Sequence, residues 1–333
     1  MEPRITAVIP YYKGAKYIRQ AVESVIEQTI LPTELIIIDD GSPDGGPHEA
    51  LAGLETDAFP VIHLRQENAG QSAARNYGIR QAKGDFIALL DQDDVWFPRH
   101  LEKLVHPFSH DDGRMGWTYS SWSETDEHGG IVIANWMEGR PVENPKQTLA
   151  HMLAIGVMIQ PGAALFKRKA VEAVGLFDPN LSGYEDDDLF IRLFYAGWTN
   201  AFVPDVLSTW RVYWASSQFG ERTTRSRRYY FDKLIRAFPD DPRGLRCWVR
   251  DCIAPHFTWI ATAEYERALV VREDAACRQM AEDAIRYASY TDRAHVGRKQ
   301  RLKMRLMRRP GTMRLVHAVW ARVPERLRRV IMR

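Results

Sequence analysis

The sequence predicts an α/β protein with a Rossmann-like, mostly parallel sheet, followed by an α-helical C-terminal region. Through the first hundred residues, short apolar runs typical of buried strands alternate with segments of helical periodicity. This alternation favours parallel strands with helices on both faces of the sheet. Beyond about residue 215 the periodicity is helical only.

Four apolar runs predict the first strands of the sheet. They are residues 5–9, 35–39, 61–64 and 86–90, and helices are expected at 17–26, at 70–84 and from Pro98. In open parallel sheets, ligands bind beyond the carboxyl ends of the strands. The residues that follow these runs are therefore the first candidates for a site.

The remainder of the chain is less regular. After a looser α+β stretch, a helix is expected at 183–197 and one or two strands at 199–214. We expect an α/β domain over residues 1–215, a helical region over residues 216–296 and a separate tail over residues 297–333.

The composition indicates an ordinary globular protein. Hydrophobic residues make up 45% of the 333 residues, which is enough for a normal core. The three cysteines lack the spacing of a disulfide framework or a zinc site, and no segment has the apolar length of a signal peptide or a membrane span. We therefore expect a cytoplasmic protein that is neither exported nor membrane-spanning.

The C-terminal tail differs from the rest in charge. Residues 297–333 contain 13 Lys or Arg and one acid, whereas residues 1–296 contain 32 basic and 42 acidic residues. Apolar residues recur in the tail every three or four positions, with Thr312 as the expected helix N-cap and a break at Pro324. Such a helix favours an anionic membrane surface, here the inner face of the cytoplasmic membrane, and docking on the acidic body of the same protein is the alternative. No nucleic-acid partner is expected, because no recognisable module surrounds the tail.

Three acids follow the fourth predicted strand in the stretch IALLDQDDVWFP. Asp91, Asp93 and Asp94 lie within four residues, between apolar runs. Like charges this close are costly unless a cation, a basic partner or water accepts them. Carboxylates suit Mg²⁺ or Mn²⁺, which are commonly shared with substrate phosphates. A solvated acidic turn before a helix is the alternative.

Two other acidic segments are candidates. Asp39 and Asp40 end the second strand, where a carboxylate either accepts hydrogen bonds from a nucleotide or opens an Asx turn. The four acids 185–188 open a predicted helix. Stabilisation of the helix dipole explains one or two acids in a first turn, but not four in a row. Crowding raises the pKa of such carboxyl groups, so one of them is a candidate general base.

Two common motifs are absent from the sequence. No G-x-G-x-x-G follows the first strand, where IPYYKGAKY stands, and no G-x-x-x-x-G-K-[ST] occurs anywhere. Nicotinamide dehydrogenases and P-loop NTPases are therefore disfavoured.

Three stretches closely resemble the successive motifs of family 2 glycosyltransferases with the GT-A fold. They are AVIPYYKGAKYIRQAVESVIEQTILPTELIIIDDGSPDG, ENAGQSAARNYGIRQAKGDFIALLDQDDVWFP and GYEDDDLFIRLFYAG. The resemblance keeps order and spacing over roughly residues 4–215 and says little about residues 216–333. It implies the fold of nucleotide-diphospho-sugar transferases and a role similar to that of bacterial surface-polysaccharide enzymes.

The resemblance also implies roles for the matching residues. Pro10 and Tyr12 would line the pocket for the nucleobase. Asp40 would accept a hydrogen bond from the base, with Asp39 beside it, and Arg75 would approach the nucleotide. The acids of the D-x-D motif would hold the ribose and a Mn²⁺ or Mg²⁺ ion, with Asp91 placed on the nucleotide and Asp93 and Asp94 on the metal. Asp186 matches the catalytic base of inverting members. Further candidates at the donor or acceptor site are Glu185, Trp210, Arg211 and Tyr213, of which Tyr213 stands where many members carry a metal-binding histidine.

The implied reaction is that of an inverting hexosyltransferase. It would move a sugar from a UDP- or dTDP-sugar to a hydroxyl of a glycan or lipid-linked glycan in cell-surface polysaccharide synthesis. The metal would neutralise the leaving diphosphate, and Asp186 would take the acceptor proton. The alternatives are a haloacid-dehalogenase-like phosphatase with Asp91 as nucleophile and a non-catalytic nucleotide-sugar-binding module.

Overall fold

The computed structural model describes residues 3–54, 56–213, 221–241, 243, 245–291 and 298–321. Within it the chain forms two compact units. The first comprises Met1–Met152 and Val157–Tyr230, and the second comprises Leu153–Gly156 and Phe231–Arg333. The first unit is α/β and the second is helical, as the sequence predicts for the fold class.

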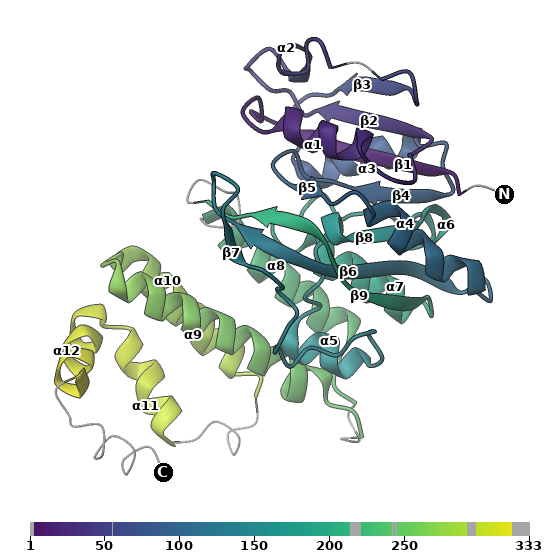
Figure 1. The fold of residues 1–333 in the computed structure, drawn as a ribbon. Helices are drawn as coiled ribbons and strands as arrows, with labels where there is room; N and C mark the ends of the chain where they lie inside the picture. Colours follow the sequence, from purple (N-terminus) through teal and green to yellow (C-terminus); the bar gives the residue numbers. More distant parts are fainter. Residues whose placement is uncertain are drawn as a thin grey trace. The chain divides into compact units, whose positions relative to one another are not determined.

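The sheet of the first unit begins with four parallel strands, all of them expected (Figure 1). They are β1 (Ile5–Tyr11), β2 (Glu34–Asp39), β3 (Val61–Arg65) and β4 (Phe86–Leu89), in the spatial order β3-β2-β1-β4. Tyr11, Asp39 and Arg65 are opposite one another in the register, so β1, β2 and β3 end level. The polar residues that follow them therefore share one edge of the sheet.

The sheet continues beyond β4 with mixed strand directions. The order continues as β8-β6-β9-β5, comprising β8 (Ala164–Lys167), β6 (Met115–Thr125), β9 (Thr199–Arg211) and β5 (Val95–Trp96), and β7 (Ile131–Ile133) pairs with β6. β6 and β9 are parallel, whereas β8 is antiparallel to both β4 and β6. The described part of the segment expected at 199–214, residues 199–213, thus contributes a single strand. β5 was not predicted, because two residues carry no periodicity.

Helices cover both faces of the parallel half. Alternate β1 residues, Ile5, Ala7 and Ile9, pack with the buried face of α1 (Ile18–Ile26). α3 (Gln71–Gln81) packs on the opposite face, where a Cβ at Gly78 would lie 2.6 Å from Val8 Cγ1. Only glycine permits this approach, so the helix lies directly against β1 and β2.

The other helices of the first unit connect the strands. They are α2 (Pro47–Ala50), α4 (His100–Val105), η1 (His106–His110), η2 (Pro161–Ala163), α6 (Arg168–Ala173) and α7 (Glu185–Tyr195). α5 (Leu149–Ile155) and α8 (Glu221–Ala237) each run across a boundary between the units. The helix expected from Pro98 begins at His100, and the one expected at 183–197 is α7.

The second unit is built from helices. After η3 (Val249–Ile253) come α9 (Ala254–Val270), α10 (Asp274–Ala288), α11 (Arg298–Met307) and α12 (Pro310–Ala321). Phe231 contacts Phe257 and Tyr287 in the core, at ring-centroid distances of 5.2 and 4.5 Å. None of the helices in the described ranges combines the length and apolar character needed to cross a membrane.

The tail helices pack on this unit through methionines. Met304, Met307 and Met313 are buried, Lys303 Nζ lies 2.8 Å from Glu266 Oε1, and Arg314 pairs with Asp274. α12 begins at Pro310, so the expected N-cap at Thr312 was wrong. Proline is favoured in the first turn because that turn's N–H groups have no partner in the helix. Pro324 lies outside the described residues.

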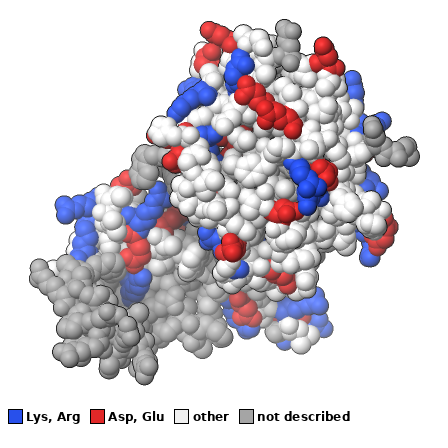
Figure 2. All heavy atoms as spheres, viewed as in Figure 1, with Lys and Arg blue, Asp and Glu red and all other residues white. Residues whose placement is uncertain are grey.

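Charged side chains are mixed on the face drawn in Figure 2. Basic and acidic groups lie among uncharged residues there, both over the strands and over the helices. Charge alone therefore identifies no binding surface among the residues described on this face, and the site has to be located from specific contacts.

Candidate active site

The turn after β4 is fastened to the end of β1 by a glutamine side chain. Gln92 Oε1 accepts the Tyr12 N–H at 2.8 Å, and Gln92 Nε2 donates to the Tyr12 carbonyl at 3.0 Å. A Cβ at Gly14 would lie 2.1 Å from Gln92 Oε1, so the clamp requires glycine there. The Tyr12 ring is 41% exposed and thus available to a ligand. Pro10 is buried within β1.

Asp39 and Asp40, at the end of β2, are both buried but have different partners. Asp39 accepts the Ser42 N–H at 2.8 Å and pairs with Arg65. Asp40 accepts three donors from the loop before α3, namely Gln66 Nε2 at 2.7 Å and the N–H groups of Ala69 and Gly70 at 2.8 and 2.9 Å. Asp40 therefore holds this loop in place, and Asp39 keeps more unused acceptor positions.

The three acids of the 91–94 turn point to different partners. Asp91 Oδ1 accepts from Gln71 Nε2 at 2.8 Å and from Arg75 at 2.7 Å. Asp93 Oδ2 accepts the Tyr213 hydroxyl at 2.9 Å. Asp94 is 2% exposed and accepts the Arg211 N–H at 2.8 Å. Each of the three carboxyl groups thus retains an oxygen without a hydrogen bond, but Asp91 and Asp93 are half-buried whereas Asp94 is buried.

Burial and mutual repulsion raise the pKa of two of these acids. Burial, followed by the charge of Asp91, raises the pKa of Asp93 to about 6. Burial and the charges of Asp93 and Asp91 raise the pKa of Asp94 well above its usual range. A cation bound at this turn would therefore stabilise the charged form of these carboxyl groups.

Arg211 holds the turn from the end of β9. Its Nε donates to the Asp93 carbonyl at 2.8 Å, and its guanidinium also reaches the Glu127 carbonyl and Gln20 Oε1, at 3.1 and 2.8 Å. Tyr213, two residues on, contacts Asp93 directly. Trp210, half-buried on β9, is opposite Glu124 of β6 in the register, and in the described part of the chain neither side chain hydrogen-bonds to the turn.

A buried arginine connects the 91–94 turn to the first turn of α7. Arg75, on α3, is 2% exposed. Its guanidinium lies 2.7 Å from Asp91 Oδ1 and 3.4 Å from Glu185 Oε1. Glu185 also accepts the Gly183 N–H at 2.5 Å. Two acidic segments far apart in sequence are thus joined through one side chain.

Asp186 follows Glu185 and accepts the Asp187 N–H at 3.0 Å. Burial, then the charges of Glu185 and Asp187, raise the pKa of Asp186 well above its usual value. A carboxylate in such surroundings is suited to take up a proton.

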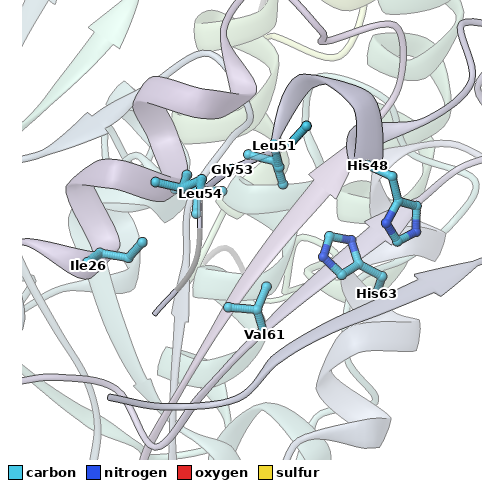
Figure 3. A pocket seen from close by; sticks show the side chains of 9 residues that line it. Ile26, His48, Leu51, Gly53, Leu54, Val61 and His63 are labelled. Atoms are coloured by element: carbon cyan, nitrogen blue, oxygen red, sulfur yellow. The ribbon is translucent and has the colours of Figure 1, made fainter. Parts of the chain in front are cut away.

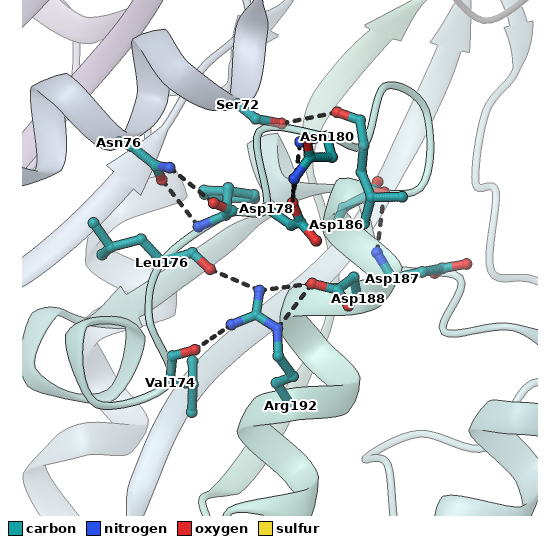
Figure 4. Close-up of polar contacts among 12 residues, drawn as sticks. Ser72, Asn76, Val174, Leu176, Asp178, Asn180, Asp186, Asp187, Asp188 and Arg192 are labelled. Carbon is teal, nitrogen blue, oxygen red and sulfur yellow. Dashed lines mark hydrogen bonds and ion pairs between the residues drawn. The ribbon is translucent and has the colours of Figure 1, made fainter. Parts of the chain in front are cut away.

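The loop before α7 is anchored at both ends (Figure 4). Asn76 of α3 exchanges two hydrogen bonds with the backbone of Phe177, at 2.8 and 2.9 Å, and Ser72 donates to the Leu181 carbonyl at 3.2 Å. Arg192 pairs with Asp188 at 2.8 Å and donates to the Leu176 carbonyl at 2.6 Å. These contacts fix the start of α7 relative to α3.

The acid turn offers part of a coordination shell for a divalent ion. Within the described ranges, no three His, Cys, Asp or Glu side chains converge as a ligand set. Mg²⁺ and Mn²⁺ are commonly bound by one or two carboxylates together with substrate phosphates. The free oxygens of Asp91 and Asp93 fit that arrangement, and burial together with the charge of Asp91 raises the pKa of Asp93.

A separate cavity lies beside the edge strand β3 (Figure 3). It has a volume of about 240 Å³ and is lined by apolar residues of α1 and the 51–54 loop, with the stacked rings of His48 and His63 on one side. The two ring centroids are 4.3 Å apart. None of the predicted site residues lines this cavity.

Sequence reasoning missed several residues that hold the site together. Gln92 occupies the variable position of the D-x-D motif, and Gln71 opens α3. Both are ordinary polar residues whose roles depend on contacts across the sheet edge.

Comparison with known proteins gives consistent matches. Residues 6–175 match the family model described as "Glycosyl transferase family 2". A Bacillus subtilis protein described as "Putative glycosyltransferase EpsH" is 29% identical over 219 residues, which cover 64% of this chain and 62% of that protein. An "Uncharacterized glycosyltransferase" of Rickettsia bellii is 28% identical over 192 residues, 58% of this chain and 27% of that protein. The chain spans between 27% and 59% of the length of the five Rickettsia relatives it matches.

A solved structure of similar fold is S. aureus TarS 1-349 in complex with UDP-GlcNAc. The TM-score is 0.60 at 15% identity, and the match covers 93% of this chain and 88% of that chain. At this identity the likeness shows the fold alone.

Proposed function

Because this chain belongs to glycosyltransferase family 2, we propose that it transfers a sugar from a nucleoside-diphosphate sugar to a hydroxyl of a glycan or lipid-linked glycan. The family makes the protein a transferase with a GT-A-like fold. A UDP- or dTDP-sugar is the proposed donor, supported by the UDP-GlcNAc bound to TarS. Synthesis of a cell-surface polysaccharide is the proposed pathway.

The observation that carries this proposal is the Arg75 bridge. A donor diphosphate beside Asp91 and an acceptor hydroxyl beside Asp186 must lie close together for an in-line displacement. Arg75 links Asp91 to Glu185, the neighbour of Asp186, and so supports that proximity. A phosphatase that uses Asp91 as nucleophile is disfavoured by the family match and by the engagement of Asp91 with Arg75 and Gln71.

The proposed reaction is a single displacement. The acceptor oxygen forms a bond to the anomeric carbon as the bond from that carbon to the diphosphate oxygen breaks. The proton of the acceptor hydroxyl moves to the Asp186 carboxylate, and the anomeric configuration inverts. Burial acts to lower the pKa of Arg75, but the charges of Asp91 and Glu185 outweigh it and raise that pKa, so Arg75 stays protonated throughout.

We assign the base contact to Asp39 rather than to Asp40. Three donors of the 66–70 loop already occupy Asp40, whereas Asp39 accepts from Ser42 and Arg65 only. The exposed Tyr12 ring would stack on the base beside it. Asp40 then acts on the nucleotide only through the loop that it holds.

A divalent metal, when bound, would neutralise the charge that develops on the leaving diphosphate. Asp91 and Asp93 are its proposed ligands, because each has an oxygen free of hydrogen bonds and is half-buried, whereas Asp94 is buried. Asp94 was expected to be a ligand, and its inward bond to the Arg211 N–H favours a role in shaping the turn instead. Tyr213 occupies the place of the family histidine and orients Asp93 through its hydroxyl.

A thermal-shift panel of UDP, dTDP and GDP, each with Mn²⁺ and with chelator, tests donor and metal together. We expect UDP or dTDP to raise the melting temperature more with Mn²⁺ than without. Asp93→Asn should remove the Mn²⁺-dependent part. Asp205→Asn is the matched control, because Asp205 pairs with Lys103 at 3.0 Å and has no place in the site. Binding without transfer to any acceptor would instead favour a non-catalytic nucleotide-sugar-binding module.

We also propose that the tail helices contact an anionic membrane surface. Leu302, Leu315 and Val316 are 58%, 65% and 41% exposed, although Met304, Met307 and Met313 pack inward. Exposed arginines flank the apolar residues, at 305, 308 and 309. This combination suits anionic headgroups. Leu315→Ser with Val316→Ser should reduce co-sedimentation with phosphatidylglycerol vesicles, while Val270→Ser on α9, 79% exposed, should not. Equal sedimentation of the tail variant and wild type would reject the contact.

A further inference from the structure

Asp93, a proposed metal ligand, is held by the last residues of β9. Arg211 Nε donates to the Asp93 carbonyl at 2.8 Å, and the Tyr213 hydroxyl donates to Asp93 Oδ2 at 2.9 Å. The backbone and the carboxyl group of Asp93 are thus both fixed from this strand, and Oδ1 is the oxygen that remains for a cation. The direction in which Oδ1 points therefore depends on where Arg211 and Tyr213 lie.

Tyr213 follows the part of β9 that is paired in the sheet. The register of β6 and β9 ends at Thr125 and Arg211, and the Val212 N–H donates to the Thr125 carbonyl at 2.8 Å. Because Tyr213 comes after these contacts, strand pairing does not set the position of its ring. A side chain that packs against the ring can do so.

The ring of Tyr17 makes this contact from the start of α1. Its centroid lies 5.8 Å from that of the Tyr213 ring, at an interplanar angle of 39°. The guanidinium carbon of Arg211 lies 4.8 Å from the centroid of the same Tyr17 ring. A tilted aromatic pair at this separation and an arginine over a ring face are both attractive. One side chain therefore contacts both residues that hold Asp93.

The backbone of Tyr17 is fixed in the turn that opens α1. Tyr17 is half-buried, its N–H donates to the Gly14 carbonyl at 2.9 Å, and its carbonyl accepts the Gln20 N–H at 3.0 Å. Ile18, the next residue, is fully buried in the core beneath α1. Gln20 Oε1 also accepts from Arg211 at 2.8 Å, so α1 holds Arg211 at a second point. The first turn of α1 is therefore a firm support for the end of β9.

We propose that Tyr17 is a positioning residue for metal binding at Asp93. Its ring holds Tyr213 and Arg211 against the turn, so that the Tyr213 hydroxyl occupies Oδ2 and Asp93 presents Oδ1 to a divalent ion. Loss of a group that orients a metal ligand typically weakens metal binding by about tenfold to a hundredfold. The ligand role of Asp93 rests on the proposed function, whereas the contact between Tyr17 and Tyr213 does not.

Calorimetric titration of Mn²⁺ into the full chain in the presence of UDP tests the proposal without any turnover. Tyr17→Leu keeps an apolar side chain but loses the ring, and we expect it to bind Mn²⁺ about tenfold more weakly than the wild type. Tyr17→Phe keeps the ring that contacts Tyr213 and Arg211. It should therefore restore the wild-type affinity for Mn²⁺.

Tyr213→Phe separates positioning from packing. It keeps the ring beside Tyr17 and removes only the hydroxyl bond to Asp93, so it should also weaken Mn²⁺ binding about tenfold. In the double variant that combines Tyr17→Leu with Tyr213→Phe, the loss of affinity should be smaller than the product of the two single losses, because both changes release the same carboxyl group. A merely structural role for Tyr17 would let the two losses multiply.

Phe108→Leu serves as the matched control. Phe108 is also half-buried, and its ring centroid lies 4.7 Å from that of Phe86, at the amino end of β4. This variant should lose stability and still bind Mn²⁺ as the wild type does. If it weakens Mn²⁺ binding as much as Tyr17→Leu, the effect comes from general destabilisation and the proposal is overturned.

Fluorine NMR of the protein labelled with 3-fluorotyrosine reads the contact in the absence of metal. The Tyr213 resonance is identified by its loss in Tyr213→Phe. It should shift in Tyr17→Leu but not in Phe108→Leu, because only the first change removes the neighbouring ring. An unchanged Tyr213 resonance in Tyr17→Leu, or an unchanged Mn²⁺ affinity of that variant, would overturn the proposal.

Tyr213→Phe decides the matter if Tyr17→Leu does not fold, since a wild-type affinity for Mn²⁺ in Tyr213→Phe would overturn the proposal. If the wild type binds no Mn²⁺ with UDP while the Tyr213 resonance still depends on Tyr17, the metal assignment of the proposed function fails, the positioning role fails with it, and only the contact stands. If the wild type binds Mn²⁺ and transfers sugar but Tyr17→Leu binds Mn²⁺ equally well, the positioning role alone fails.

Discussion

Replacing Arg75 with methionine should uncouple β4 from α7. Arg75 is 2% exposed, and its two partners, Asp91 and Glu185, have side chains that are 26% and 8% exposed. Removing one partner of a buried ion pair costs roughly 3–5 kcal/mol, because the remaining charge stays buried. Asp91 can regain water, so Glu185 dominates the cost and we expect about 3 kcal/mol. Methionine keeps an apolar stem beside the Phe177 ring, which limits losses from packing.

Urea unfolding of four proteins measures this cost. They are the wild type, Arg75→Met, Glu185→Gln and the double variant. Glu185→Gln alone should lower the unfolding free energy less than Arg75→Met does, since Arg75 keeps its ion pair with Asp91. The double variant should recover part of the unfolding free energy that Arg75→Met loses. The coupling energy should fall between about 1 and 3 kcal/mol. A loss below about 1 kcal/mol for Arg75→Met, or strict additivity, would refute the view that Arg75 is the buried link between the two acidic segments.

Two further predictions concern the residues around the turn. Burial lowers the pKa of His100 to about 3, below its unfolded value near 6.5, so its contribution to stability is present above pH 6.5 and is lost as the pH falls from there toward 3. His100→Asn should therefore show a smaller loss of unfolding free energy between pH 7 and pH 4 than the wild type, and parallel pH curves would contradict this reasoning. Gly14→Ala should displace Gln92 from Tyr12, weakening nucleotide binding measured by calorimetry and costing roughly 1 kcal/mol per lost hydrogen bond. Gly311→Ala, which meets no neighbouring atom, is the control, and equal affinities for the two alanine variants would rule out the clamp.

The parallel half of the fold was predictable because its signals are local. The apolar runs 35–39 and 86–90 cannot be exposed, and the helical spacing of 17–26 gives α1 one buried face. The edge strand β5 and the parallel pairing of β6 with β9 were not predictable, because strands distant in sequence leave no local periodicity that identifies a partner.

The candidate site was predictable as a set of acids but not as a set of partners. The sequence alone indicated Asp39, Asp40, the acids of the 91–94 turn and the cluster that opens α7. It did not distinguish the inward Asp94 from Asp93, because that difference comes from Arg211 on a strand beyond residue 198. The partners of Asp40 were not predictable for the same reason, since its donors belong to a loop more than 25 residues away in sequence.

By itself, the sequence determined the α/β class, the family and the positions where negative charge gathers, because hydrophobic periodicity and motif spacing are properties of short segments. Only the tertiary structure decided which cation meets which acid. Arg75 lies on α3, 110 residues from Glu185 in the sequence, and burial makes its charge act strongly at short range on Asp91 and Glu185. The link between the 91–94 turn and the start of α7 is therefore a consequence of long-range packing.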